Sequence, residues 1–345
     1  MRTSLVLGLD VGGTSTRAVL ASIDGKRVGT GRAGGGNPTT HGPAAAGHLK
    51  AALGEALTGV EPAAVRAGTI GLAGGARLGA DPDARTAFDR VWRDAGLRCE
   101  YAVVSDALAA YAAGTPAPDG TVLIAGTGAI AAEICDLAVA RVADGHGWLL
   151  GDAGSGFWLG REAVRRTLAD LDAGREPAPL SRLVLRQLLG AAAPAEPSSR
   201  AMVESVVQAV TRRPPVELAA LSNLVMRAYA AGDAGAREIV DEAARLLSAS
   251  IARIRPADAV TPVVLGGGLL TTDTPLARAV SREIDRRWPA APRRLARNAA
   301  AGAAWLAARG LPEVTDPLAL HHKLLPTDEI ASGTDVPAGA GPRRP

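Results

Sequence analysis

A chain of 345 residues, 47% of them hydrophobic, can bury a large core and predicts two domains, because single cores stop growing at about 250–300 residues. The 38 basic and 35 acidic residues leave a net charge of only +3, and no basic run or aromatic-interleaved stripe occurs, so nucleic acid is not an expected partner. The absence of a signal-peptide pattern and of any run of about 18 apolar residues argues against a membrane protein and favours a cytoplasmic one.

The first third of the chain alternates apolar runs with longer periodic segments. Strands are expected at 4–9, 16–23, 26–33, 67–73 and 100–105, and helices at 43–57, 83–95 and 106–114. Asp24-Gly25, between the second and third strands, is a hairpin signal, so the sheet begins antiparallel. The later alternation of strands and helices is typical of an α/β structure.

The remainder of the chain begins with a similar pattern. Its expected elements are strands and turns at 121–136, a mostly helical stretch at about 154–256, a strand with a glycine turn at 261–270, and helices near 275–288 and 298–309. The stretch AAAPAEPSS (191–199) has the composition of a linker. The tail from about residue 311 is rich in Pro, Gly and Asp and is expected to be poorly ordered.

Three glycine-rich turns each follow an apolar run. They are Gly12-Gly13-Thr14, Gly126-Thr127-Gly128 and Gly266-Gly267-Gly268. Glycine permits positive φ and lets backbone N–H groups approach phosphate oxygens, and a threonine hydroxyl adds a donor. Taken alone, the first turn is better explained by a hairpin, and the third by a strand-to-helix turn with a packing role. The similarity between LGLDVGGTSTRAV and LIAGTGAIAAEI predicts two related halves that hold one polyanion from both sides.

Neither of two standard nucleotide-binding motifs describes these turns well. GxxxxGK[ST] does not occur, which disfavours the P-loop class. GTGAIA, with Gly126, Gly128 and Ala131, formally matches the dinucleotide fingerprint, provided that a helix follows it. That interpretation is the weaker one, because Asp136 falls too early for the expected acid and Asp144 lies in a Gly-flanked turn.

Five segments together resemble a known family. LDVGGTSTRAVL, VVSDALAAY, LIAGTGAI, GWLLGDAGSGFWLGREAV and VVLGGGL are similar, in this order, to the N-acetylglucosamine kinase branch of the sugar kinase, Hsp70 and actin superfold, also grouped with the BadF/BadG-type ATPases. The resemblance covers residues 4 to about 310. It implies an α/β fold of two ribonuclease-H-like (actin-like ATPase) domains with an interdomain nucleotide cleft. The implied domains are 1–115, completed by the helix at 298–310, and 116–297 with a helical insertion, followed by the tail 311–345.

The resemblance also implies how ATP and Mg²⁺ would bind. Gly12, Gly13 and Thr14 would form the first phosphate loop, Gly126, Thr127 and Gly128 the second, and Gly266 with Gly267 the turn beside adenosine. Asp10, at the end of the first strand, would face Mg²⁺ through water, because Mg²⁺ dehydrates reluctantly and is usually held by one or two carboxylates plus phosphate oxygens.

Asp106 is the candidate general base. A sugar hydroxyl that attacks a γ-phosphoryl group must lose its proton, and a carboxylate within hydrogen-bond reach can accept it. The local sequence alone favours an N-cap of the helix at 106–114. The position of Asp106 in VVSDA, which matches the family's catalytic strand end, favours the base.

Asn37, Asp152 and Gly145, together with Asp106 itself, are the candidate ligands of the sugar. An amide offers a donor and an acceptor, and a carboxylate can accept from paired hydroxyls, which suits a pyranose ring. Asn37 lies in GGGNPTT, which could be an ordinary turn. Asp152 lies in GDAGS, which resembles the family's GDEGS, with helix capping as the alternative, and Gly145 matches the family's sugar-side glycine less closely.

The implied function is an ATP-dependent kinase that phosphorylates the 6-hydroxyl of an amino sugar, with N-acetylglucosamine as the first candidate. Three departures from the family affect the acceptor side: Ala153 in place of Glu, Ala129 where Ser is frequent, and the stretch 144–148 in place of GGWG. They do not decide whether the acceptor is N-acetylglucosamine, glucosamine or N-acetylmuramic acid. They also do not decide whether His146 contacts the substrate. A homodimer is common in the family.

Two other functions fit the same fold. An ATPase activator of the benzoyl-CoA reductase type needs cysteines for an iron–sulfur cluster at a subunit interface. Cys99 and Cys135 form no CxxC pair and lie before and within expected strands. A non-catalytic sugar-sensing regulator would not need the acids at positions 10, 106 and 152, so their presence favours catalysis.

Overall fold

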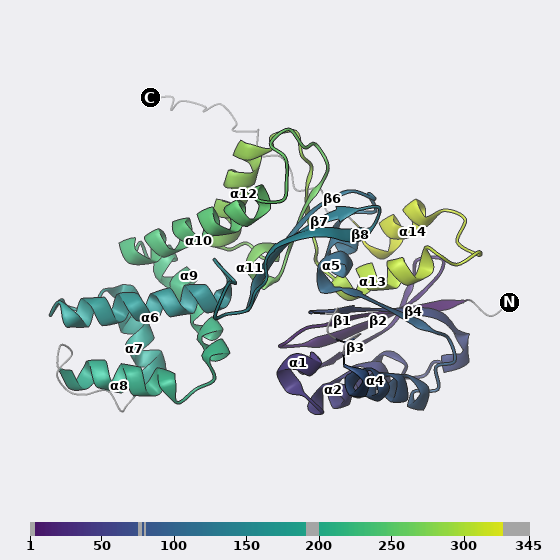
Figure 1. Ribbon diagram of the computed structural model, residues 1–345, viewed down its shortest axis with the longest axis horizontal. Helices are drawn as coiled ribbons and strands as arrows, with labels where there is room; N and C mark the ends of the chain where they lie inside the picture. Colours follow the sequence, from purple (N-terminus) through teal and green to yellow (C-terminus); the bar gives the residue numbers. More distant parts are fainter. Residues whose placement is uncertain (1–3, 75–77, 79–80, 191–199, 327–345) are drawn as a thin grey trace, which may run out of the picture.

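The computed structural model describes residues 4–74, 78, 81–190 and 200–326. The predicted linker at 191–199 and residues 327–345 of the predicted tail lie outside them. Figure 1 shows two β-sheets, each with its own helices, and two helices packed between the sheets. No helix in the described part of the chain is long and apolar enough to cross a membrane.

The first sheet is a mixed sheet of five strands. These are β1 (Leu5–Val11), β2 (Thr16–Ser22), β3 (Arg27–Ala33), β4 (Val65–Leu72) and β5 (Tyr101–Ser105), in the order β3-β2-β1-β4-β5. β1, β2 and β3 are antiparallel neighbours, whereas β4 and β5 run parallel to β1. The short helix α1 (Pro38–His41) follows β3, and α2 (Ala44–Ala56) and α4 (Pro82–Asp94) cover one face of the sheet. The near-continuous apolar run of β1 fits a central strand that is buried on both faces.

The second sheet repeats this topology. Its strands are β6 (Gly120–Ala125), β7 (Ala129–Cys135), β8 (Ala138–Asp144), β9 (Val263–Gly266) and β10 (Arg293–Leu295), in the order β10-β9-β6-β7-β8. β6, β7 and β8 are antiparallel neighbours, and β9 and β10 run parallel to β6. The prediction of an α/β fold with two related halves is therefore confirmed. The strand β7 stands where a dinucleotide fingerprint requires a helix, which excludes that interpretation.

Helices make up most of the second half between its strands. They are α6 (Gly156–Asp172), α7 (Pro179–Leu189), α8 (Arg200–Thr211), the 3-10 helix η3 (Pro215–Leu221), α9 (Ser222–Ala230), α10 (Ala234–Ala252), α11 (Gly268–Thr271) and α12 (Pro275–Arg287). Their buried residues share one core with β6, β7 and β9. The predicted helical stretch at about 154–256 is confirmed over its described part.

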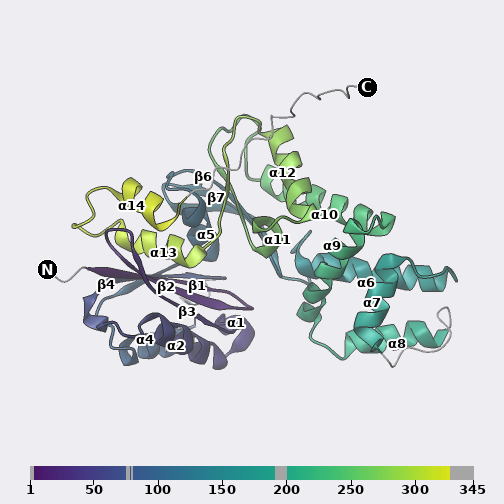
Figure 2. The same cartoon turned by 180° about the vertical axis from the view of Figure 1, so that it is seen from behind.

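Two alanine-rich helices, α5 (Asp106–Gly114) and α13 (Ala299–Ala308), pack against each other between the sheets, as Figure 2 shows from behind. Gly302 of α13 has no room for a side chain, because an added Cβ would overlap the carbonyl oxygen of Ala109 on α5. Gly8 of β1 likewise lies directly against the backbone of α13. This close packing fixes α5, whose first residue is Asp106, against the first sheet. The domain boundaries implied by the resemblance stay predictions.

The prediction that the tail is poorly ordered from residue 311 is wrong for the residues up to 326. Helix α14 (Pro317–Leu324) begins after the N-cap Asp316, and its Leu320 and Leu324 are buried in the core between the sheets. The Pro and Asp that suggested disorder are here helix-start signals, because Pro317 occupies the first helical position and Asp316 caps it.

His321 is expected to make the docking of α14 sensitive to acid. Its buried Nε2 donates to the carbonyl oxygen of Ala112 at 2.8 Å, Nδ1 has no partner among the described residues, and burial lowers the pKa of the imidazole to about 4. Neutral His321 therefore contributes stability above pH 6.5, its ordinary pKa, and that stability is lost as the pH falls toward 4.

We expect the free energy of unfolding, measured by urea titration, to decrease between pH 6.5 and pH 4 by more in the wild type than in His321→Gln. The difference between the two decreases should be about 1–3 kcal/mol. Glutamine keeps a donor for Ala112 but does not titrate. Equal slopes for the two proteins would contradict the role given to His321.

Candidate active site

Asp10 and Asp106 lie at the carboxyl ends of parallel strands in the first sheet. Asp10 is near the end of β1, Asp106 directly follows β5, and β4 lies between these two strands. Burial is the largest cause that raises the pKa of both carboxyl groups. The charge of Asp106 raises the pKa of Asp10 further, to about 6, against the opposing effect of Arg17. The structure thus brings the candidate metal ligand and the candidate base together, at the strand ends where open α/β sheets bind ligands.

Asp106 is not the N-cap of its helix. The N-cap of α5 is Ser105, whose Oγ accepts a hydrogen bond from the backbone N–H of Ala107 at 3.1 Å. The Oδ1 of Asp106 accepts from the same N–H at 2.9 Å and from the Ser105 hydroxyl at 3.3 Å. Within the described residues, Oδ2 receives no hydrogen bond. One carboxylate oxygen is therefore oriented by the helix start, and the other is left for a ligand.

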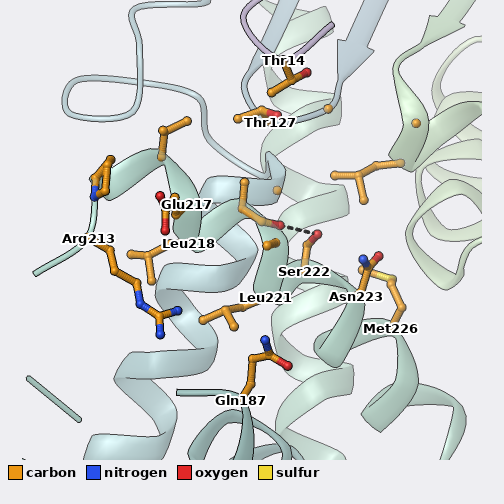
Figure 3. Close-up of a pocket in the computed structure, with 18 of the residues that line it drawn as sticks. Thr14, Thr127, Gln187, Arg213, Glu217, Leu218, Leu221, Ser222, Asn223 and Met226 are labelled. Atoms are coloured by element: carbon orange, nitrogen blue, oxygen red, sulfur yellow. Dashed lines mark hydrogen bonds between the residues drawn. The ribbon is translucent and has the colours of Figure 1, made fainter. Parts of the chain in front are cut away.

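The first two glycine turns line the same cavity, although they belong to different sheets. Thr14 lies between β1 and β2, and Gly126 and Thr127 lie between β6 and β7. Figure 3 shows Thr14 and Thr127 toward the same end of this cavity, with Arg213 and Gln187 further along it. Its volume of about 840 Å³ is within the range of small-molecule and cofactor sites.

The third glycine turn contributes its last residue to this cavity. Gly266 is buried within β9, and Gly267 has a φ of +81° and lies so close to β6 that an added Cβ would overlap the carbonyl oxygen of Ala125. The residues that line the cavity here are Gly268 and Leu269. The run of three glycines carried no signal for which of them lines the cavity and which one packs against β6.

Sequence reasoning also missed the far wall of the cavity. The wall comes from the end of α8, from η3 and from the start of α9, and includes Arg213, Glu217, Asn223 and Met226. These residues form no recognisable motif, because they are brought together only by the packing of neighbouring helices.

Asp152 is held against the second glycine turn. Its Oδ1 accepts from the backbone N–H of Ala129 at 3.1 Å, and an added Cβ on Gly128 would come within 2.9 Å of its carboxylate. Asp152 has a φ of +57°, which is uncommon for a residue other than glycine. The alternative of helix capping is wrong, because the N-cap of α6 is Ser155, whose Oγ accepts from the N–H of Trp158 at 3.2 Å.

Asp144 organises the loop that carries Asp152. This buried carboxylate accepts hydrogen bonds from the backbone N–H groups of Gly145, Asp152 and Ala153, at 2.8, 2.7 and 2.9 Å. Hydrogen bonds to a charged acceptor are about twice as strong as neutral ones, so Asp144 ties both ends of the loop firmly. The sequence showed only an acid in a Gly-flanked turn and gave no sign of this arrangement.

Asn37 is the N-cap of α1 and lies beside the first glycine turn. Its Oδ1 accepts from the N–H of Thr39 at 2.9 Å, and its Nδ2 donates to the carbonyl oxygen of Ala73, just after β4, at 3.1 Å. An amide oxygen has two lone pairs and an amide nitrogen two hydrogens. The Asn37 side chain is therefore fixed at the carboxyl end of the first sheet and keeps one donor and one acceptor for a ligand.

The candidate sugar ligands fall into two separate groups. Asn37 and Asp106 belong to the first sheet, whereas Asp152 and Gly145 belong to the second. Within the described residues, Asp152 has no hydrogen bond to Asn37, Asp106 or Asp10. Any single ligand that contacts both groups would have to lie between the two halves.

The two cysteines belong to different halves of the molecule. Cys99 precedes β5 and is half-buried, and Cys135 ends β7 and is exposed. Burial raises the pKa of the Cys99 thiol. No group of three or more His, Cys, Asp and Glu side chains in the described part of the chain could hold a metal ion.

Comparison with known sequences gives two findings. The family model of the BadF/BadG/BcrA/BcrD ATPases matches residues 7–307. A curated N-acetylmuramic acid/N-acetylglucosamine kinase from Clostridium acetobutylicum is 29% identical over 183 residues. That alignment covers 53% of this chain and 56% of the relative, so the match spans about half the length of each.

Comparison with solved structures shows the fold. A Chromobacterium violaceum protein, described as a candidate N-acetylglucosamine kinase, has a TM-score of 0.69 and 24% identity, over 89% of this chain and 99% of its own. A Streptomyces griseus ROK family glucokinase, solved with glucose and AMPPNP, has a TM-score of 0.56 and 21% identity, over 89% and 100%. The predicted sugar kinase and actin-like fold is thereby confirmed. Because the family model matches from β1 to α13, well over half of the sequence, the chain belongs to the BadF/BadG/BcrA/BcrD ATPase family.

Proposed function

We propose that this protein is an ATP-dependent kinase that phosphorylates the 6-hydroxyl of an amino sugar. The observation that carries the proposal is the convergence of two Gly–Thr turns, from different sheets, on one cavity, together with the pair of carboxylates at the strand ends beside the first turn. The curated relative, named as an N-acetylmuramic acid/N-acetylglucosamine kinase, supports the sugar class.

In this proposal the ATP phosphates lie between the two turns. Gly12, Gly13 and Thr14 contact them from the first sheet, and Gly126, Thr127 and Gly128 from the second. The adenosine extends into the cavity past Gly268 and Leu269, while Gly266 and Gly267 hold the turn against β6.

The residues present fit a magnesium ion. Asp10 is a buried carboxylate, and burial followed by the charge of Asp106 raises its pKa to about 6, so a cation beside it would be favourable. Mg²⁺ bound there would neutralise charge on the transferred phosphate. Asp10 would hold it through water, and phosphate oxygens would complete its coordination.

Asp106 acts as the general base. Its ordered Oδ1 fixes the carboxylate at the start of α5, and the other oxygen accepts the proton of the 6-hydroxyl during attack. Asn37 and Asp152, with the backbone at Gly145, orient the sugar from the two halves. Closure of the halves would exclude water and so prevent idle hydrolysis of ATP.

The raised pKa values predict an acid limb in the pH profile. Because the base and the metal ligand must both be ionised, kcat/KM is expected to fall below about pH 6. A higher Mg²⁺ concentration should move the midpoint to lower pH, since the cation favours ionised Asp10. A kcat/KM that is flat from pH 5 to 8, or a midpoint independent of Mg²⁺, would contradict the pairing of these two acids.

The acceptor is tested by phosphate transfer from Mg-ATP to N-acetylglucosamine, glucosamine, N-acetylmuramic acid and glucose. We propose N-acetylglucosamine as the preferred acceptor, with its 6-phosphate, identified by ³¹P NMR, as the product. A 6-deoxy analogue should bind but accept no phosphate. Phosphate found at another hydroxyl would contradict the 6-hydroxyl assignment but would still support a sugar kinase.

A further inference from the structure

The loop between β3 and α1 is bonded to the first glycine turn at several points. The backbone N–H groups of Gly36 and Asn37 both donate to the carbonyl oxygen of Gly12, at 3.1 and 3.3 Å. The hydroxyl of Thr16, just after the turn, donates to the carbonyl oxygen of Gly34 at 2.9 Å. An added Cβ on Gly35 would overlap the Gly13 carbonyl oxygen, so the two backbones are in direct contact. Loop and turn therefore form one unit.

Two histidines complete this unit. Nε2 of His41, in α1, lies 2.6 Å from the carbonyl oxygen of Gly13, and Nδ1 of His48, in α2, lies 2.5 Å from that of Gly35. A carbonyl oxygen can only accept, so each histidine donates from the nitrogen that faces it. The two rings also pack edge to face, with centroids 5.8 Å apart.

The His41 bond determines where the next backbone donor points. A trans peptide is planar, so the carbonyl of Gly13 and the N–H of Thr14 point in opposite directions. The Gly13 carbonyl is held toward α1, and Thr14 lines the cavity in which the phosphates are proposed to bind. The same reasoning applies one residue earlier. The loop holds the Gly12 carbonyl oxygen, so the Gly13 N–H points in the opposite direction.

We propose that His41 is a positioning residue for nucleotide binding, which aims the Thr14 N–H at a phosphate by holding the Gly13 carbonyl. The inference rests on the proposed function, because it takes the cavity as the nucleotide site. Since Asn37 belongs to the same unit, the bond also links sugar recognition to the phosphate loop. A ligand that orders the loop through Asn37 then improves the geometry for ATP, and by linkage ATP improves sugar binding by the same factor.

The test measures the dissociation constant of Mg-ADP by calorimetry, which requires no knowledge of the acceptor. His41→Leu removes the donor, whereas His41→Gln keeps an N–H that can reach the same carbonyl. We expect the leucine variant to bind Mg-ADP about 5- to 20-fold more weakly and the glutamine variant to stay within about 3-fold of the wild type. In the kinase assay, His41→Leu should raise KM for ATP by a larger factor than it lowers kcat.

His48→Leu is the matched control, because it disrupts the same ring pair but leaves the bond to Gly13 in place. It should weaken Mg-ADP binding by a smaller factor than His41→Leu. If the wild type binds Mg-ADP and His41→Leu binds it equally well, or if the leucine and glutamine variants lose the same affinity, the positioning role is wrong and the proposed function stands. If the wild type binds no Mg-ADP, the proposed function fails and this inference fails with it.

Discussion

Asp106→Asn is expected to lower kcat by about 10²–10⁴-fold while the sugar and Mg-ADP still bind. Asparagine has nearly the same size, and its Oδ1 can still accept from the N–H of Ala107, so the start of α5 should keep its shape. It cannot take the proton of the attacking hydroxyl. Single-turnover kinetics and calorimetry on the same preparation separate the chemical step from binding.

Ser105→Ala is the matched control for this substitution. It removes the N-cap of the same helix, which is expected to cost about 1 kcal/mol of stability, but it leaves the Asp106 carboxylate in place. Its kcat should stay within about 10-fold of the wild type, well above that of Asp106→Asn. Loss of sugar binding in Asp106→Asn with little change in kcat would show that Asp106 is a sugar ligand and not the base.

Asp10→Asn should remove activity and, at the same time, stabilise the ligand-free protein. Folding raises the pKa of Asp10 from 3.8 to about 6, so ionised Asp10 costs stability at neutral pH. The cost is absent below pH 3.8, grows up to about pH 6 and is constant above it. Relief of this cost should raise the free energy of unfolding by about 1–3 kcal/mol at pH 8. With this metal ligand gone, kcat/KM should fall at least about 100-fold and a higher Mg²⁺ concentration should be needed for half of the remaining activity.

Asp24→Asn is the control, because its effect on stability should have the opposite sign. Asp24 is exposed in the β2–β3 turn, and its hydrogen bond with the Ser22 hydroxyl lowers the pKa of its carboxyl group. Neutralising it should leave activity unchanged and slightly lower the stability at pH 8. An Asp10→Asn protein that is less stable than the wild type in the absence of ligand would contradict the account of Asp10 as a strained, functional carboxylate.

Much of the fold could be predicted from local sequence because its signals are local. The apolar run before Asp10 and the Asp24-Gly25 hairpin each depend on residues close together in the chain, and the structure places strands and a turn there. Asp10 and Asp106 were each predicted at a strand end, and the structure brings them together because the carboxyl ends of parallel strands meet at one edge of a sheet.

The missed features depend on contacts between distant segments. Asp144 is buried only because the loop returns to it eight residues later, and the far wall of the cavity exists only where η3 packs beside α9. The composition of the tail did not predict α14 or the burial of His321, because Pro and Asp are typical both of helix starts and of disordered segments. Asp152 and Asp106 belong to different sheets, and no local pattern records how the two sheets are placed relative to each other.

The most direct test of the central claim is ADP release from Mg-ATP, measured by a coupled assay with each candidate amino sugar and with no sugar, for the wild type and Asp106→Asn in parallel. We predict that release depends on an amino sugar and falls by about 10²–10⁴-fold in the variant. ADP release at the same rate without any sugar would contradict the kinase and show an ATPase instead.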